Sequence, residues 1–449
     1  MNELLSLSPI DGRYLNKTKE LIDSFSEYAL IKKRVNIEIK WLLYLIDKKI
    51  IDEKLNKEER DSITNIIDKF NLEEAMVVKQ IEGVTKHDVK SCEYYLQVKF
   101  QELKLDRLIP FIHITLTSED VNNTSYNLMI KDGLKIYLDN LNNLVNKIDS
   151  LSKTYKKTPM MAHTHGQNAT PTTVGKEFKV FSYRLKSIIN LINNLKLRSK
   201  FSGAVGNYNA HIVAFPEVDW IKVTKSFVES LDLEYNPLTT QIESHDILCV
   251  LLSYLKILNN IIKDLNSDMW LYISKGYFKE KKQDLEVGSS VMPHKVNPIN
   301  HENSMANTEI SNGLIDALVN NLSISRMQRD LSDSSKLRNL GVIFSHSLVS
   351  IKETITGLEK LEVNEKLLKE ELDNHYEVLT EAIQTVLRKN KVPKAYEILK
   401  DLSRGKELTK KDLQKFIKGL EISEEDKKIL LNLTPSKYIG LSETIVEKN

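Results

Sequence analysis

Long stretches without helix breakers constrain this chain most. No glycine or proline lies between Pro237 and Gly276, and apolar residues recur there at the three- and four-residue spacing of an α-helix. A helix of about 30 residues would be about 45 Å long, well beyond the three or four turns of an average globular helix. Two other stretches show the same spacing, so the sequence predicts several long helices. The three apolar stripes comprise Leu134, Leu138, Leu141, Val145, Ile148 and Leu151; Phe178, Phe181, Leu185, Ile188, Ile192 and Leu195; and Ile247, Val250, Tyr254, Leu258, Ile261, Leu265, Met269 and Tyr272.

The spacing predicts an all-α fold with the long helices in its middle. Residues 1–112 carry shorter helical pieces, 113–363 carry the long helices, and 364–449 change to short charged helices such as Glu407 to Lys418. We therefore expect an N-terminal helical domain, a central bundle domain and a small C-terminal helical domain. Stripes this wide often bury part of their surface against copies of the same chain, so a homo-oligomer is expected.

Composition narrows the class of protein. The 449 residues contain 64 Lys plus Arg and 62 Asp plus Glu, and a net charge of +2 does not favour a nucleic-acid or membrane partner. Two cysteines, Cys92 and Cys249, argue against a disulfide scaffold and suit a reducing compartment. The N-terminus shows no signal or transit peptide, and the longest apolar run is too short and polar to cross a bilayer. A cytoplasmic protein is expected.

The segment 288–298 combines paired hydroxyls, a cation and two prolines. It reads Gly-Ser-Ser-Val-Met-Pro-His-Lys-Val-Asn-Pro. A plain solvated loop between helices needs neither Met-Pro in its middle nor a lysine held between prolines. Polar, glycine-containing loops on a rigid scaffold often carry function, so Ser289, Ser290 and Lys295 are candidate site residues.

A second segment, 161–171, contains a histidine before a glycine. By itself His165 would more often be a turn or cap residue than a catalytic one. Histidine is the most frequent general acid in enzymes, and the pairing of this residue with the serine loop makes it a candidate proton donor. His163 is left without a role.

Thr117-Ser118-Glu119-Asp120 is typical of a helix N-terminus with acidic residues in its first turn. The free N–H groups of a helix start, together with two hydroxyls, can also hold a carboxylate. The structural and functional interpretations are compatible.

Arginines mark two further segments, 8–14 and 328–338. The first could be an N-terminal turn and the second a charged helix face. The planar guanidinium can also donate two parallel hydrogen bonds to a phosphate, which makes Arg13, Arg329 and Arg338 candidate phosphate contacts.

Together these segments resemble the adenylosuccinate lyases, a family of the fumarase/aspartase superfamily, whose members eliminate fumarate from a substituted succinate. The match at 288–298 covers eleven residues without a gap, and the resemblance runs from Ser8 to about Val363. Further matching segments are 86–89, 203–211 and 240–243. The resemblance implies a three-domain all-α fold whose long-helix bundle forms the core of a homotetramer, with each active site shared between subunits.

The resemblance also implies roles for individual residues. Ser289 would be the general base, and His165 the general acid that protonates the leaving nitrogen. Lys295 and Asn297 would hold a substrate carboxylate, and Thr117 and Ser118 the fumarate portion. Further implied substrate contacts are Arg13, Tyr14, Lys86, His87, Asp88, Gln241, Ser290, Glu302, Asn303, Arg329, Ser334 and Arg338. Lys86 departs from the pattern, since a frequent relative has Asn before His-Asp.

The implied reaction is β-elimination of fumarate from adenylosuccinate, giving AMP, and from the succinylated aminoimidazole carboxamide ribotide of purine biosynthesis. No phosphate loop after a strand and no set of residues at metal-ligand spacing is found, so neither a cofactor nor a metal is predicted. One alternative is another superfamily lyase, acting on argininosuccinate, malate or aspartate. A second is a non-catalytic helical scaffold, although Ser289, His165 and Lys295 are all present.

Overall fold

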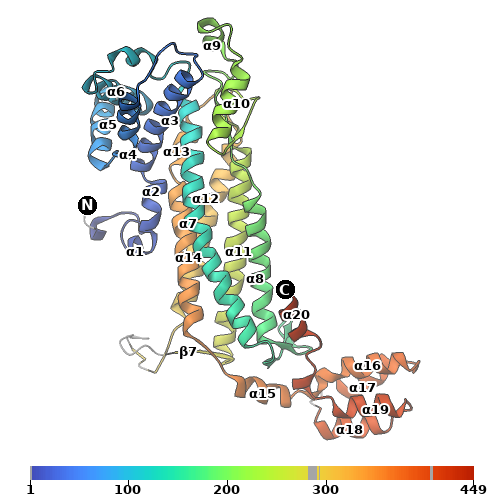
Figure 1. Cartoon of the computed structure of the whole chain (residues 1–449). Helices are drawn as coiled ribbons and strands as arrows, with labels where there is room; N and C mark the ends of the chain where they lie inside the picture. The colour runs from blue at the N-terminus through green and yellow to red at the C-terminus, as the bar shows by residue number, and fades with distance from the viewer. Residues whose placement is uncertain (1–2, 282–290, 293, 405–407) are drawn as a thin grey trace. The chain divides into compact units, whose positions relative to one another are not determined.

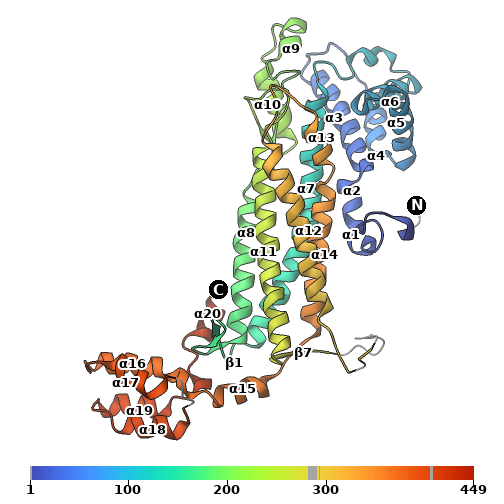
Figure 2. The same cartoon turned by 180° about the vertical axis from the view of Figure 1, so that it is seen from behind.

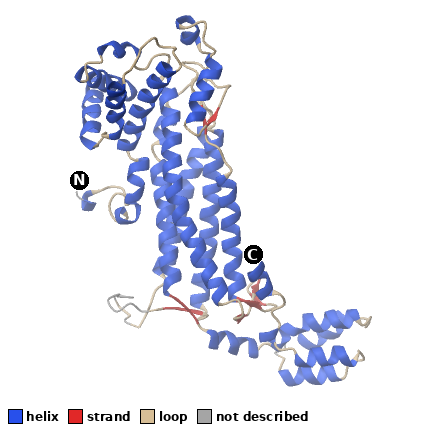
Figure 3. Cartoon of the chain, in the orientation of Figure 1, coloured by secondary structure: helices blue, strands red, loops and turns tan. Residues whose placement is uncertain are grey.

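The computed structural model describes residues 3–281, 291–292, 294–404 and 408–449. The chain divides into two compact units, and helices dominate both (Figure 3). The first comprises Met1–Asn140, Ile188–Asn260 and Ala306–Ser350, and the second Leu141–Ser187, Ile261–Met305 and Ile351–Asn449. The described residues confirm the predicted all-α class. The three domain boundaries stay a prediction.

Five long helices (Figures 1 and 2) contribute residues to both units. They carry the three predicted stripes except Leu195, which follows the end of α8 at Asn193. α7 has 37 residues and α11 has 29, which confirms the predicted length. Their bounds are α7 Ser118–Thr154, α8 Val174–Asn193, α11 Asp246–Ser274, α12 Ile299–Leu322 and α14 Leu340–Lys360. Val250, counted in the third apolar stripe, is 36% exposed, so the stripe is not buried along its whole length.

The first unit adds the predicted shorter helices of the N-terminal part. Its remaining elements are η1 Glu3–Leu5, α1 Leu15–Thr18, η2 Lys19–Leu21, α2 Ile22–Phe25, α3 Glu27–Asp47, α4 Lys57–Asp68, α5 Leu72–Thr85, α6 Asp88–Glu102, η3 Asp106–Phe111, β5 Arg198–Ser199, α9 Asn209–Ala214, α10 Trp220–Ser230, β6 Glu234–Tyr235 and α13 Ser332–Leu337. Trp41 of α3 lies at the centre of its core. The Trp41 ring lies 4.9 Å from the rings of both Phe201 and Phe227, so α3, α10 and the segment after β5 pack together.

A buried polar chain joins four long helices within this unit. The Tyr137 hydroxyl of α7 lies 2.9 Å from the Ser347 hydroxyl of α14, which donates to Asn259 Oδ1 of α11. Asn259 in turn donates to Ser311 of α12 over 3.1 Å. Because an unpaired buried polar group is costly, these bonds favour one register of the helices.

The second unit contains the predicted short, charged C-terminal helices. Its remaining elements are β1 Pro159–Met160, β2 His163–Thr164, β3 Gln167–Asn168, β4 Thr172–Thr173, β7 Phe278–Glu280, β8 Leu361–Val363, α15 Glu365–Asp373, η4 Tyr376–Leu379, α16 Thr380–Lys389, α17 Ala395–Ser403, α18 Lys410–Lys418, α19 Glu424–Asn432, η5 Pro435–Lys437 and α20 Ser442–Lys448. A separate core gathers apolar residues of the C-terminal helices around Leu379, Leu387 and Leu413, and it includes Met161.

The strands in the described part of the chain have only two or three residues and pair as β1 with β4, β2 with β3, β5 with β6 and β7 with β8. Such short pairs leave no alternation for sequence analysis to detect. None of the described helices combines the length and the apolar composition needed to cross a membrane.

Candidate functional site

The start of α7 is held by buried charges in the first unit. α7 begins at Ser118, as predicted, and the Thr117 N–H donates to Asp120 Oδ2 over 2.9 Å. Asp120 Oδ1 accepts from the backbone N–H of Ser202 and lies 2.8 Å from Lys200 Nζ. Asp120 and Lys200 are both fully buried. The N-terminus of α7 is therefore fixed by a buried ion pair and not by local helix capping alone.

The same lysine fixes the segment that carries Gln241. Lys200 Nζ donates to the carbonyl oxygens of Gln241 and Gly203, at 2.9 and 2.8 Å. The Gln241 side chain donates to the Ala204 carbonyl over 2.9 Å. The structure thus joins the Thr117-Ser118 and Gln241 segments, both predicted to bind substrate, through Lys200.

Three predicted contacts meet around one carboxylate. Asp88 Oδ2 lies 2.6 Å from Arg34 Nη2 and accepts from Arg338 over 3.3 Å, while Arg338 also donates to Ser334 Oγ at 2.6 Å. Burial alone would raise the pKa of Asp88, but the charge and hydrogen bond of Arg34 hold it below its ordinary value. Arg34, a fully buried residue that sequence analysis missed, therefore holds Asp88 ionised where it faces Arg338.

Lys86 and His87 form the junction between α5 and α6. Lys86 ends α5 in the left-handed conformation with φ 57°, and the His87 Nδ1 caps α6 by accepting from the Lys90 N–H. Both side chains are exposed. This geometry leaves His87 Nε2 facing away from its capping bond.

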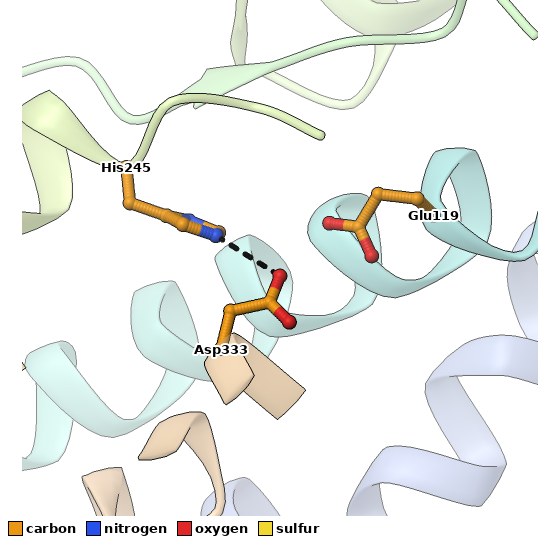
Figure 4. Close-up of side chains that lie close together, drawn as sticks. All are labelled: Glu119, His245 and Asp333. Carbon is orange, nitrogen blue, oxygen red and sulfur yellow. Dashed lines mark ion pairs between the residues drawn. The ribbon is translucent and has the colours of Figure 1, made fainter. Parts of the chain in front are cut away.

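Four charged side chains form a largely buried group in the first unit, and Figure 4 shows three of them, Glu119, His245 and Asp333. Arg329 Nη1 donates to Glu119 Oε2 over 3.1 Å, and Arg329 Nη2 lies 3.9 Å from Asp333 Oδ1. His245 Nε2 lies 3.6 Å from Asp333 Oδ2. Of the four, only Arg329 was predicted as a site residue. Glu119, His245 and Asp333 could also hold a cation, and their separation along the chain hides this set from sequence spacing.

The N-terminal segment borders a cavity next to Arg338. The cavity has a volume of about 140 Å³, and its lining includes Ile10, Asp11, Phe25 and Arg338. Arg13 follows in the same turn and is exposed, while Tyr14 is half-buried.

His165 lies at a tight turn in the second unit. β2 and β3 pair His163 with Asn168 and Thr164 with Gln167, which leaves His165 and Gly166 as the two turn residues. His163 Nε2 lies 3.0 Å from Lys275 Nζ. Burial and the Lys275 charge lower the pKa of His163, so a neutral imidazole there accepts from the lysine.

Ser289 and Ser290 lie outside the described residues. The Lys295 N–H donates to the Met292 carbonyl over 3.0 Å, and the Lys295 side chain is exposed. Asn297 precedes α12, and Glu302 and Asn303 lie in its first turns. Glu302 Oε1 accepts from the indole N–H of Trp270 over 3.1 Å, whereas Asn297 and Asn303 are half-buried.

Two family profiles match the chain. The family described as Lyase matches residues 12–310, and the one described as Adenylosuccinate lyase C-terminal matches residues 325–439. Proteins named adenylosuccinate lyase are similar over the whole chain: 47% identity for Legionella pneumophila, 45% for Buchnera aphidicola subsp. Schizaphis graminum and 43% for Escherichia coli. In each case the alignment covers 100% of this chain and 99% of the relative.

Solved structures share the fold at low sequence identity. A fumarate lyase from Mesorhizobium matches with a TM-score of 0.77 at 18% identity, covering 96% of this chain and 97% of the other. A beta-carboxy-cis,cis-muconate cycloisomerase from Acinetobacter calcoaceticus matches with a TM-score of 0.74 at 17% identity and the same coverage. These likenesses confirm the expected fumarase-like helical fold. With relatives at 43% identity or more over their full length, the chain belongs to the adenylosuccinate lyase family of the fumarase/aspartase superfamily.

Proposed function

We propose that this chain is a carbon-nitrogen lyase that eliminates fumarate from adenylosuccinate, giving AMP, and from the succinylated aminoimidazole carboxamide ribotide. The observation that carries the proposal is the full-length similarity to proteins named adenylosuccinate lyase. The intact segments around Ser289 and His165 agree with it.

The reaction divides between a base and an acid. Ser289 takes the proton from the carbon next to a succinyl carboxylate, the electron pair left on that carbon forms the C=C bond of fumarate, and the C–N bond breaks. His165 gives a proton to the departing nitrogen, which is otherwise a poor leaving group.

Negative charge grows on the carboxylate in the transition state, so hydrogen-bond donors fixed there accelerate the reaction. Lys295, Asn297, Thr117 and Ser118 are the proposed donors. Losing one such donor costs about 2.7–4 kcal/mol, or roughly a hundredfold to a thousandfold in rate.

The nucleotide end of the substrate requires a different set of contacts. Arg13, Arg329 and Arg338 are proposed to bind the phosphate, since a guanidinium can donate two parallel hydrogen bonds to it. The approach of Arg338 to Ser334 and Asp88 supports this assignment, because it gathers three proposed contacts in one place. The remaining proposed contacts are Tyr14, Lys86, His87, Gln241, Ser290, Glu302 and Asn303.

We propose that the chain works as a homotetramer in the cytoplasm, with active sites shared between subunits. Exposed apolar residues on the long helices support assembly: Val250, Ile257 and Leu271 of α11 are 36–49% exposed and recur at multiples of seven residues. Such a stripe is the kind of helix face that packs against another helix. Mixing inactive Ser289→Ala and His165→Ala proteins tests the sharing. Mixed tetramers would recover turnover if the two residues of one site come from different chains, and no recovery would contradict shared sites.

An absorbance assay of the purified chain with adenylosuccinate tests the proposed activity. We expect the purine spectrum to change as AMP forms. No spectral change would leave the non-catalytic scaffold as the better interpretation.

Replacing arginines separates this lyase from others of the superfamily. Argininosuccinate, malate and aspartate carry no phosphate. If the three arginines bind the phosphate of adenylosuccinate, then Arg13→Ala, Arg329→Ala and Arg338→Ala should each raise the KM for that substrate. An unchanged KM in all three variants would favour a different superfamily substrate.

A further inference from the structure

The buried charged group formed by Glu119, His245 and Asp333 joins three segments that are far apart in the sequence. Glu119 lies in the first turn of α7, His245 directly precedes α11, and Asp333 lies in α13. Figure 4 shows the three side chains pointing toward one another. One ligand atom of each lies within 4.8 Å of the others, and the residues are only 3%, 5% and 6% exposed.

Each member is placed next to a proposed substrate contact. Glu119 follows Ser118, Asp333 precedes Ser334, and His245 follows Gln241 by four residues. The Ser334 N–H donates to Asp333 Oδ1 over 2.7 Å. A displacement within the group would therefore move several substrate-binding segments together.

Charge balance explains how two buried carboxylates are tolerated. Arg329 contacts Glu119 at 3.1 Å and approaches Asp333 at 3.9 Å, so it supplies one positive charge. Burial would lower the pKa of His245, but the carboxylates of Asp333, Glu119 and Glu243 raise it above its ordinary value, which favours imidazolium as the second positive charge. Glu119 Oε1 and His245 Nε2 make no hydrogen bond with described residues, so charge attraction alone acts on these two atoms.

A divalent cation bound by the same three residues fits the charges less well. It would lie next to the guanidinium of Arg329, which already contacts Glu119, and like charges repel strongly in a buried site. Burial raises the pKa of Glu119 to about 7, and the charges of Arg329, His245 and Lys200 offset this rise only in part. When Glu119 and Asp333 are both ionised, Arg329 and imidazolium already supply the two balancing charges without an ion.

Resting on the proposed function, we propose that Glu119, His245 and Asp333 are positioning residues that orient the Arg329 guanidinium for the substrate phosphate. Glu119 accepts from Arg329 Nη1 at 3.1 Å and Asp333 lies 3.9 Å from Nη2, while the Arg329 side chain retains 18% exposure. Its remaining N–H groups can then donate to a phosphate in a fixed direction. Less side-chain conformational entropy is therefore lost when the phosphate binds.

Variants that remove the charge of one member test this role, and in Glu119→Gln and Asp333→Asn the shape of the side chain hardly changes. Glu119→Gln, Asp333→Asn and His245→Gln should each raise the KM for adenylosuccinate about tenfold, equivalent to about 1.4 kcal/mol, while kcat changes less than about threefold. Competitive inhibition by AMP should weaken by a similar factor, and inhibition by adenosine, which lacks the phosphate, should not change. A purely structural role would not distinguish these two inhibitors.

Asp149→Asn is a matched control in the second unit. Asp149 accepts from Lys179 at 2.9 Å and from Ser182 at 2.6 Å, so its replacement also breaks a partly buried ion pair. We expect it to lower stability and to leave KM and AMP inhibition within about twofold of the unmodified chain, since each twofold change is worth about 0.4 kcal/mol.

A double variant tests whether Asp333 acts through Arg329. Arg329→Lys retains the charge at a partly exposed position but loses the planar fork. In that background Asp333→Asn should weaken AMP inhibition by less than about twofold, because coupled residues are not additive. Additive losses would overturn the proposal.

Three further outcomes distinguish failure of the positioning role, failure of the proposed function and the presence of a metal site. Turnover by the unmodified chain with unchanged KM and AMP inhibition in all three variants would overturn the positioning role alone. No turnover by the unmodified chain would overturn the proposed function and this inference with it. We would reject the positioning role in favour of a metal site if Zn²⁺ or Mn²⁺ raised the melting temperature of the unmodified chain but not that of Asp333→Asn.

Discussion

His165 and Gly166 occupy the two central positions of the hairpin between β2 and β3, and both have positive φ, at 54° and 73°. Two successive positive φ angles are what a two-residue type I′ hairpin requires. The left-handed conformation is unfavourable for a residue with a side chain and free for glycine. Gly166 therefore supplies half of the turn that presents the His165 imidazole to solvent, and this turn agrees with the proton-donor role proposed for His165.

Gly166→Ala should reduce turnover without unfolding the chain. Apart from the two chain neighbours, no atom of the described residues lies within 4 Å of a Cβ added at Gly166, so only the φ of the variant is unfavourable there. A cost of roughly 1 kcal/mol for left-handed alanine would lower the equilibrium ratio of the correct turn to other conformations about fivefold. Steady-state kinetics with adenylosuccinate should show kcat reduced by up to that factor.

Gly83→Ala is the control for this change. Gly83 lies in α5, also has open space at the Cβ position, and has no positive φ. Alanine should stabilise the helix by about 0.5–1 kcal/mol and leave kcat unchanged. Equal kcat values in the two variants would show that the His165 turn does not limit catalysis.

Ser289→Ala and His165→Ala should each abolish detectable turnover and leave the oligomer assembled. One variant lacks the proposed base and the other the proposed acid, whereas neither change removes buried apolar surface in the described core, since His165 is exposed. Turnover can be followed by absorbance, and assembly by size-exclusion chromatography with light scattering. Near-normal turnover in either variant would show that its assigned role is wrong.

Helix length and helix starts could be predicted from the sequence because their causes are local. The absence of breakers between Pro237 and Gly276 predicted a long helix, and α11 occupies 29 of those residues. Thr117 and Ser118 predicted the start of α7 for the same reason. The sequence allows two roles for His165, a turn residue or a proton donor. Because the hairpin turn leaves its side chain exposed, the two roles are compatible.

The buried ion pairs of the first unit could not be predicted, because each joins residues distant in the chain. Arg34 and Asp88 are 54 positions apart, and Arg329 and Glu119 are 210 positions apart. Glu119 and Asp120 were interpreted as acidic first-turn residues, which their position supports, but their burial depends on Lys200 and Arg329. Only the folded chain places these compensating charges.

Acid should remove the stability that Asp149 provides. Burial alone would raise the pKa of Asp149, but its hydrogen bonds with Lys186, Ser182 and Lys179 lower it to about 2. A carboxyl whose folded pKa is depressed stabilises the fold above its unfolded pKa of about 3.9, and this contribution is lost as pH falls toward 2. The melting temperature of Asp149→Asn should therefore be below that of the unmodified chain at pH 7, and the difference should shrink between about pH 4 and pH 2. A difference that stays constant over that range would contradict the assigned pairing.

Asn266→Ala should destabilise the second unit more than removal of a surface amide does. Asn266 is fully buried in α11, donates to Ser304 at 3.1 Å and to Thr354 at 2.8 Å, and its Oδ1 lies 2.6 Å from His301 Nδ1. Burial lowers the pKa of His301 to about 4, so at neutral pH a neutral imidazole donates to Asn266.

Alanine removes this acceptor inside the bundle, where a donor without a partner costs about 1–3 kcal/mol in addition to the lost amide contacts. We expect a loss of about 3 kcal/mol in the free energy of unfolding, measured with urea at fixed protein concentration because assembly shifts apparent stability. Asn194→Ala removes an exposed amide that donates to the Asn190 carbonyl within the same segment, and it should change the free energy of unfolding by less than about 0.5 kcal/mol. Similar values for the two variants would mean that the polar contacts between α11, α12 and α14 do not specify the packing of these helices.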